Sequence, residues 1–141
     1  TFSIASGNDD VEEVAVAFGD PVGTMDLGSS DLELGEMAET DFHLMLSEKK
    51  IEVKYDRKTK ETGNVYIEFE SRGKPSGIKT TQADYWTYYI DDDFTITIST
   101  EKLKDKMKNL FETKKAKIIS GGDDNTSKGL LIKVQDLVCL N

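Results

Sequence analysis

The chain has 141 residues, of which 37% are hydrophobic and 32% are charged, as expected for one soluble globular domain. Its apolar runs are far shorter than the roughly 20 residues that a membrane helix needs, so we expect no membrane partner. The single cysteine, Cys139, excludes an internal disulfide and fits a reducing, cytoplasmic compartment.

Charge is unevenly distributed along the chain. The net charge of −9, taken alone, argues against a nucleic-acid partner. However, residues 1–48 hold 12 Asp or Glu and no Lys or Arg, whereas residues 49–141 hold 18 Lys or Arg against 15 Asp or Glu. The acidic first third is interpreted as a solvated face, whereas the basic clusters of the second part are candidates for a local phosphate-binding surface. The candidates for contact with nucleic acid are Arg57, Lys58, Lys74 and Lys79.

The first third of the chain predicts a helix, a loop and a hairpin. Residues 9–18 have acids in the first turn and apolar residues on one face, which indicates a helix. Residues 20–35 are rich in glycine and read as a loop, with a helical turn over 30–38 as an alternative. Residues 41–46 and 51–55 alternate around a short polar turn and predict two strands of a hairpin.

The rest of the chain alternates between strands and helices. Gly63 and Asn64 lead into a well-alternating strand, and Thr80 or Thr81 is placed to cap a helix rich in aromatic residues. The predicted elements are strands over residues 65–70, 94–99, 117–120 and 130–134, and helices over 82–89 and 100–112. This order predicts a single α/β domain over residues 1–141, with a central mixed sheet flanked by helices.

Three polar residues near the hairpin form a candidate active site. Glu52 and Lys54 are two apart on one strand, so they project from the same face, while Val53 points the other way, into the core. Asp41 starts the partner strand, and the hairpin register decides whether it lies beside Glu52. The plain alternative is surface alternation for Glu52 and Lys54, with Asp41 in a turn.

The chemistry of such a group suits a divalent metal ion. Asp41 and Glu52 would supply the carboxylate oxygens that Mg²⁺ or Mn²⁺ prefers, with the backbone carbonyl of Val53 as a further ligand. The metal would place an activated water against a phosphodiester. Lys54 would orient that water or bind the phosphate.

The pattern Thr40-Asp41, then Glu52-Val53-Lys54 after ten residues, resembles the PD-(D/E)XK nuclease superfamily, with Thr40 where Pro usually stands. Residues 51–70 (IEVKYDRKTKETGNVYIEFE) and 76–86 (SGIKTTQADYW) resemble phage-encoded and Holliday-junction-resolvase-like members. The resemblance covers about residues 9–99. It implies a restriction-endonuclease-like core, with a helix, three antiparallel strands, a second helix and a further strand.

The resemblance also implies an activity and further site residues. Members cleave DNA, or sometimes RNA, with Mg²⁺ or Mn²⁺, and the resolvase-like ones act as homodimers. An acid of the first helix, Glu12 or else Glu13, would join the metal site, and Gln82 would touch the substrate or the catalytic lysine. For Glu68 the alternatives are a group that supports the site residues from behind, a contact of Lys54, and a plain residue of the solvent-facing side of its strand.

The expected function is therefore a metal-dependent endonuclease acting on DNA, with branched or structured DNA as one candidate substrate. Two alternatives stand beside it: a non-catalytic nuclease-fold binding module, and an acidic protein that binds other proteins. The acidic first third favours the last of these.

Overall fold

The computed structural model describes residues 29–140, so the predicted helix over residues 9–18, with Glu12 and Glu13, lies outside the described residues. The chain divides into two compact units, residues 1–47 and 48–141, and each is described by itself. In the part of the chain that the structure describes, no helix is long and apolar enough to span a membrane.

The described part of the first unit is one helix, α2 (Ser29–Glu48). The strand predicted over residues 41–46 is therefore wrong, and so is the hairpin. Phe, Leu and Leu at alternate positions imitate a strand over six residues, but the 20-residue segment is rich in Leu and Glu, which favour helix. The Thr40 and Ser47 hydroxyls donate to the carbonyls of Glu36 and His43, the bonds that such residues make inside helices.

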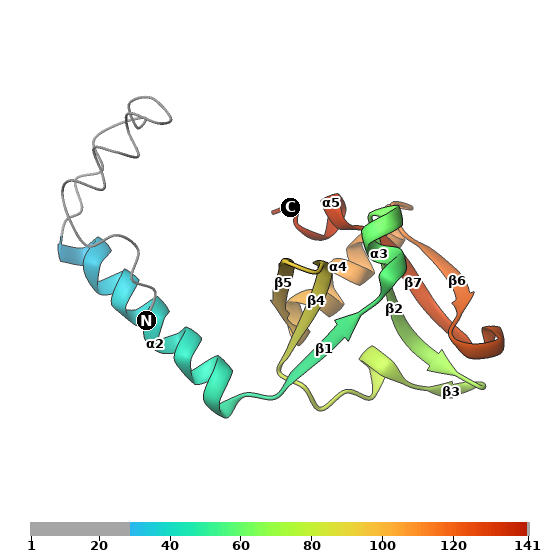
Figure 1. Ribbon diagram of the computed structural model, residues 1–141, viewed down its shortest axis with the longest axis horizontal. Coiled ribbons are helices and arrows are strands. Elements are labelled where there is room, and N and C mark those ends of the chain that lie inside the picture. Colours follow the sequence, from blue (N-terminus) through green and yellow to red (C-terminus); the bar gives the residue numbers. More distant parts are fainter. Residues whose placement is uncertain (1–28, 141) are drawn as a thin grey trace, which may run out of the picture. The chain divides into compact units, whose positions relative to one another are not determined.

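The second unit contains two sheets (Figure 1). The first has the order β1-β4-β5, formed by Ile51–Tyr55, Tyr85–Asp91 and Phe94–Ser99. In this sheet β1 and β4 are parallel and β4 and β5 are antiparallel. The second sheet is antiparallel throughout and has the order β3-β2-β7-β6, formed by Lys74–Pro75, Asn64–Ser71, Ser127–Lys133 and Lys117–Gly121.

Short helices and turns connect these strands, and one longer helix packs on them. They are α3 (Arg57–Thr62), η1 (Gly77–Lys79), α4 (Thr100–Glu112), η2 (Asp123–Asn125) and α5 (Val134–Leu137). The α/β class, with a mixed sheet and helices, is confirmed. The predicted antiparallel run of three strands is not present, because β1 pairs with β4 and β2 pairs with β3 and β7.

The helix predicted over residues 82–89 is also wrong, because most of this segment is strand β4. Trp86 and Tyr88 are buried and their neighbours are less so, which is the two-residue period of a strand. Aromatic residues favour this pleated setting. The Thr81 hydroxyl accepts from the Ala83 N–H and so closes a turn instead of capping a helix.

The core lies where α4 meets both sheets. Leu103, on α4, and Val65 and Ile67, on β2, are completely buried. The predicted helix over residues 100–112 is confirmed, and its cap is Ser99, whose hydroxyl accepts from the Lys102 N–H. Thr100, the first residue of the helix, is buried, and its hydroxyl donates to the Ala83 carbonyl at 2.6 Å.

Candidate functional site

The strand β1 holds two of the predicted site residues on one face. The Glu52 carboxylate and the Lys54 ammonium form an ion pair at 3.0 Å, with side chains 44% and 45% exposed. Their shared face is the one predicted from the two-residue spacing. The predicted burial of Val53 is wrong, since its side chain is 57% exposed on this edge strand.

An aromatic ring on the neighbouring strand supports the lysine. The parallel register sets Glu52 opposite Trp86 and Lys54 opposite Tyr88. The Lys54 Nζ lies 5.4 Å from the centre of the Trp86 ring, within the range of a cation–π interaction. Trp86 is only 2% exposed, so the ring is a fixed platform. The ion pair and the ring together restrict where the ammonium can point.

A groove of about 460 Å³ brings this pair together with other predicted residues. Glu52, Lys54, Glu68 and Gln82 all line it, and so do Thr80, Thr81 and Lys50. Lys50 belongs to the basic pair Lys49-Lys50 that precedes β1, and this charge was the only feature of the sequence that indicated it.

Backbone contacts explain why Gln82 reaches the start of β1. The Asp84 carboxylate accepts from the Lys50 N–H at 3.0 Å, and the Asp84 N–H donates to the Lys50 carbonyl at 2.8 Å. These two bonds close a ring between residues 34 positions apart. The turn over residues 80–84 is therefore held beside β1, and Gln82 is exposed at the groove.

Glu68 is positioned by the turn that follows β3. The Ser76 hydroxyl donates to its Oε2 at 3.0 Å. Gly77 sits against the same residue: a Cβ placed there would lie 2.2 Å from the Glu68 carbonyl oxygen, and φ at Gly77 is +56°. Both facts require glycine at this position. The Ser76-Gly77 turn thus fixes the backbone and the carboxylate of Glu68 at one wall of the groove.

A smaller cavity of about 240 Å³ adjoins the groove and shares Lys54, Glu68 and Trp86 with it. Tyr88 lines this cavity and is 4% exposed. Burial raises the pKa of the Tyr88 hydroxyl well above its ordinary value, and the negative charge of Glu52 raises the pKa further. This tyrosine is therefore neutral at physiological pH.

The remaining predicted residues do not gather at the groove. Asp41 is exposed on α2, in the first unit, and the hairpin that would have placed it beside Glu52 does not form. Arg57 and Lys58 are exposed at the start of α3, and Lys74 is exposed in β3. Lys79, in η1, lines a different groove, formed with α4.

Metal ligands at the groove are few. Within residues 29–140, no three or more His, Cys, Asp or Glu side chains gather in a group that could hold a metal ion. The groove contains two carboxylates, those of Glu52 and Glu68. Two carboxylates fit a hard ion such as Mg²⁺, which keeps several of its own waters, but do not fit an ion that needs a complete protein shell.

Known proteins offer no guide to the role of this groove. No protein-family model, no curated protein and no solved structure matches the chain.

Proposed function

We propose that the second unit carries the active site of a metal-dependent nuclease with a restriction-endonuclease-like core, which hydrolyses phosphodiester bonds in DNA. One observation carries the proposal: the paired Glu52 and Lys54 open onto the same groove as Glu68 and Gln82. Carboxylates, an ammonium and an amide are groups that position water, metal and phosphate in such reactions. The resemblance of residues 51–70 and 76–86 to PD-(D/E)XK nucleases supports the same function.

Lys54 is the residue that would meet the phosphate. Its side chain is 45% exposed, and the Trp86 ring and Glu52 limit the directions of its ammonium. A phosphate oxygen is a better acceptor for an ammonium than water is, because the hydrogen bond is charge-assisted on both sides. Gln82 offers one acceptor and two donors at the same groove, and it would orient the attacking water or a sugar oxygen.

Glu52 and Glu68 are the residues that would hold the metal ion. A bound Mg²⁺ or Mn²⁺ would supply an activated water and neutralise the charge that develops on the phosphate. The Ser76 hydroxyl donates to one Glu68 carboxylate oxygen and so orients it, and the other oxygen would be the metal ligand. Asp41, Glu12 and the Val53 carbonyl stay predictions as further ligands.

One observation favours the alternative of a non-catalytic module that binds nucleic acid. Within residues 29–140, Lys54 is already paired with Glu52, and no group of three acids is available for a metal. A protein of this kind would bind DNA equally with and without divalent metal and would not cut it. Cleavage therefore separates the two functions directly.

The test uses the full chain and end-labelled linear, flapped and four-way DNA, with and without Mg²⁺ or Mn²⁺. Cleavage should require the metal, and Glu52→Gln or Lys54→Ala should each slow it by about 100-fold or more. Failure of the wild type to cut any of the three substrates with either metal contradicts the proposal. So does cutting that survives both substitutions, which would indicate another site or a contaminating enzyme.

Matched controls separate loss of the site from loss of charge. Glu61→Gln, exposed on α3, repeats the Glu52 change, and Lys102→Ala, exposed on α4, repeats the Lys54 change. Neither residue lines the groove, so both variants should cut at the wild-type rate. Asp41→Asn tests the ligand predicted in the first unit, because the rate falls only if that carboxylate takes part.

A further inference from the structure

A second groove, apart from the nuclease site, lies between α4 and the antiparallel sheet. Its volume is about 460 Å³. Phe69 comes from β2, Ile118 from β6 and Leu130 from β7, while α4 contributes Met107 and Phe111. Phe111 is 50% exposed and Ile118 is 49% exposed. Apolar side chains thus line a hollow that is open to solvent, as in binding sites for small apolar ligands.

The charges at this groove have one sign. Three of its lining residues are lysines, Lys79, Lys104 and Lys108, and the described residues that line it include no Asp or Glu. The Lys79 Nζ lies 4.9 Å from the centre of the Phe69 ring, so this ammonium reaches over the apolar lining. The groove on the nuclease side, in contrast, holds two carboxylates.

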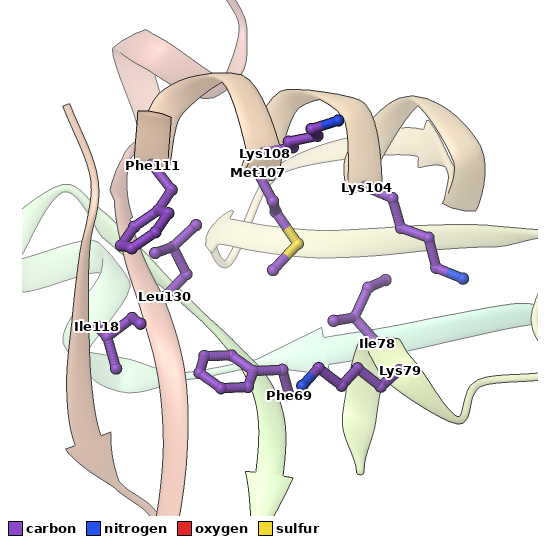
Figure 2. A pocket seen from close by; sticks show the side chains of 9 residues that line it. All are labelled: Phe69, Ile78, Lys79, Lys104, Met107, Lys108, Phe111, Ile118 and Leu130. Atoms are coloured by element: carbon purple, nitrogen blue, oxygen red, sulfur yellow. The ribbon is translucent and has the colours of Figure 1, made fainter. Parts of the chain in front are cut away.

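Figure 2 shows how the lysines and the apolar side chains are distributed along the groove. Lys104 and Ile78 lie at one end and Phe111 and Ile118 at the opposite end, while the Lys79 side chain extends from the Ile78 end to its ammonium beside Phe69. Met107 and Phe69 occupy the space between them. A ligand that matched this order would carry a negative charge at one end of an aliphatic chain.

We propose that this groove binds a free, linear aliphatic carboxylate, with its head between Lys79 and Lys104 and its chain toward Phe111 and Ile118. Burial of the chain provides the affinity, and the ammonium groups fix the direction. A nucleobase fits less well, because its polar edges would meet only aliphatic and phenyl groups at the apolar end. This site goes beyond the proposed nuclease function and does not depend on it.

A chain-length series measures the apolar part of the site. Octanoate, decanoate and dodecanoate, each below its critical micelle concentration, are titrated into the full chain by calorimetry. Affinity should rise about tenfold for each pair of added methylenes until the chain outgrows the groove. Decyltrimethylammonium, which has a similar chain and the opposite charge, should bind at least about tenfold more weakly than decanoate.

Two pairs of variants locate the binding. Lys104→Glu should weaken decanoate about tenfold, whereas Lys102→Glu, the same change on the same helix outside the groove, should leave it unchanged. Ile118→Asp places a charge at the apolar end and should abolish binding, with the exposed Val138→Asp as its control. Thermal unfolding checks that each variant is folded.

Several results would overturn the proposal. These are no binding of any of the three carboxylates, equal binding of decyltrimethylammonium, or equal effects of Lys104→Glu and Lys102→Glu. Binding only to lipid vesicles would assign the groove to a membrane surface. Binding only of a short single-stranded DNA or an acidic peptide would assign it to that partner, and either outcome rejects a free carboxylate.

Discussion

Tyr88→Phe removes one oxygen atom from the wall of the cavity that adjoins the groove of Glu52 and Lys54. The side chain is 4% exposed, and within residues 29–140 its hydroxyl has no hydrogen-bond partner. Its ring is stacked near Trp86, with the ring centres 6.1 Å apart and an angle of 24° between the planes. Phenylalanine keeps the ring and removes only the unpartnered group.

At pH 7 the substitution should stabilise the protein. A buried polar group without a partner costs about 1–3 kcal/mol, whereas loss of ring packing is avoided because the shape is preserved. We expect the free energy of unfolding to rise by about 1 kcal/mol, the lower end of that range, because neighbouring groups relax. If the hydroxyl had a bound water as its partner, the substitution would instead lower the free energy of unfolding.

Alkaline pH should widen the difference between wild type and variant. Burial, with a smaller effect of Glu52, raises the pKa of Tyr88 above its ordinary value of 10.0. The stability linked to the neutral hydroxyl is complete below pH 10 and is lost above it, because only the unfolded tyrosine then ionises. The loss approaches about 1.4 kcal/mol per pH unit, and Tyr88→Phe is free of it.

Urea denaturation at pH 7.0 and pH 10.5, followed by the fluorescence of the single tryptophan, measures both effects. Tyr85→Phe, on the same strand but only half-buried, controls for removal of a tyrosine hydroxyl. The reasoning is refuted if Tyr88→Phe is less stable than wild type at pH 7.0. It is also refuted if the difference between them does not grow at pH 10.5.

Two further substitutions test the packing that holds the groove residues in place. Gly77→Ala should lower the free energy of unfolding by about 2 kcal/mol or more, because a Cβ would meet the Glu68 backbone at a positive φ. Urea denaturation measures it, and a loss below about 0.5 kcal/mol would contradict the clash. Leu103→Ala, at a completely buried position, should cost about 2–5 kcal/mol by the same method, and a smaller loss would mean that α4 packs loosely.

The sequence predicted those parts of the fold whose pattern is local. The helix α4 and the strands β2 and β5 each carry their own periodicity, so their existence did not depend on distant partners. The same period of two correctly placed Glu52 and Lys54 on one face of β1. These features follow from backbone geometry alone.

Two elements were wrong for physical reasons that short patterns cannot resolve. In residues 41–46 apolar and polar residues alternate over a short stretch, but these residues belong to a helix that begins at Ser29. The longer helical segment determines their structure. In β4, Trp86 and Tyr88 occupy alternate positions, as in a strand, although the high content of aromatic residues was taken to indicate a helix. Hence the hairpin partner of Glu52, assigned to Asp41, was also wrong.

The surroundings of Lys54 depend on pairing between distant segments. Trp86 lies beside Lys54 because β1 and β4 pair in parallel. The sequence of neither strand indicates which strand it pairs with or in which register. Gln82 was expected to contact the substrate or Lys54 from a helix, whereas it lines the groove from the turn that Asp84 connects to Lys50. Its contact with a substrate stays a prediction.

The pairing of β2 with β7 also determines when this protein can fold during its synthesis. Val65, on β2, has Ile132 as its partner, so nearly the whole second unit must leave the ribosome before β2 gains its inner neighbour. Until then Glu68 sits on a strand whose inner edge has no β7 partner. Closing so long a segment of chain slows folding, so the order of synthesis delays the formation of this wall of the groove.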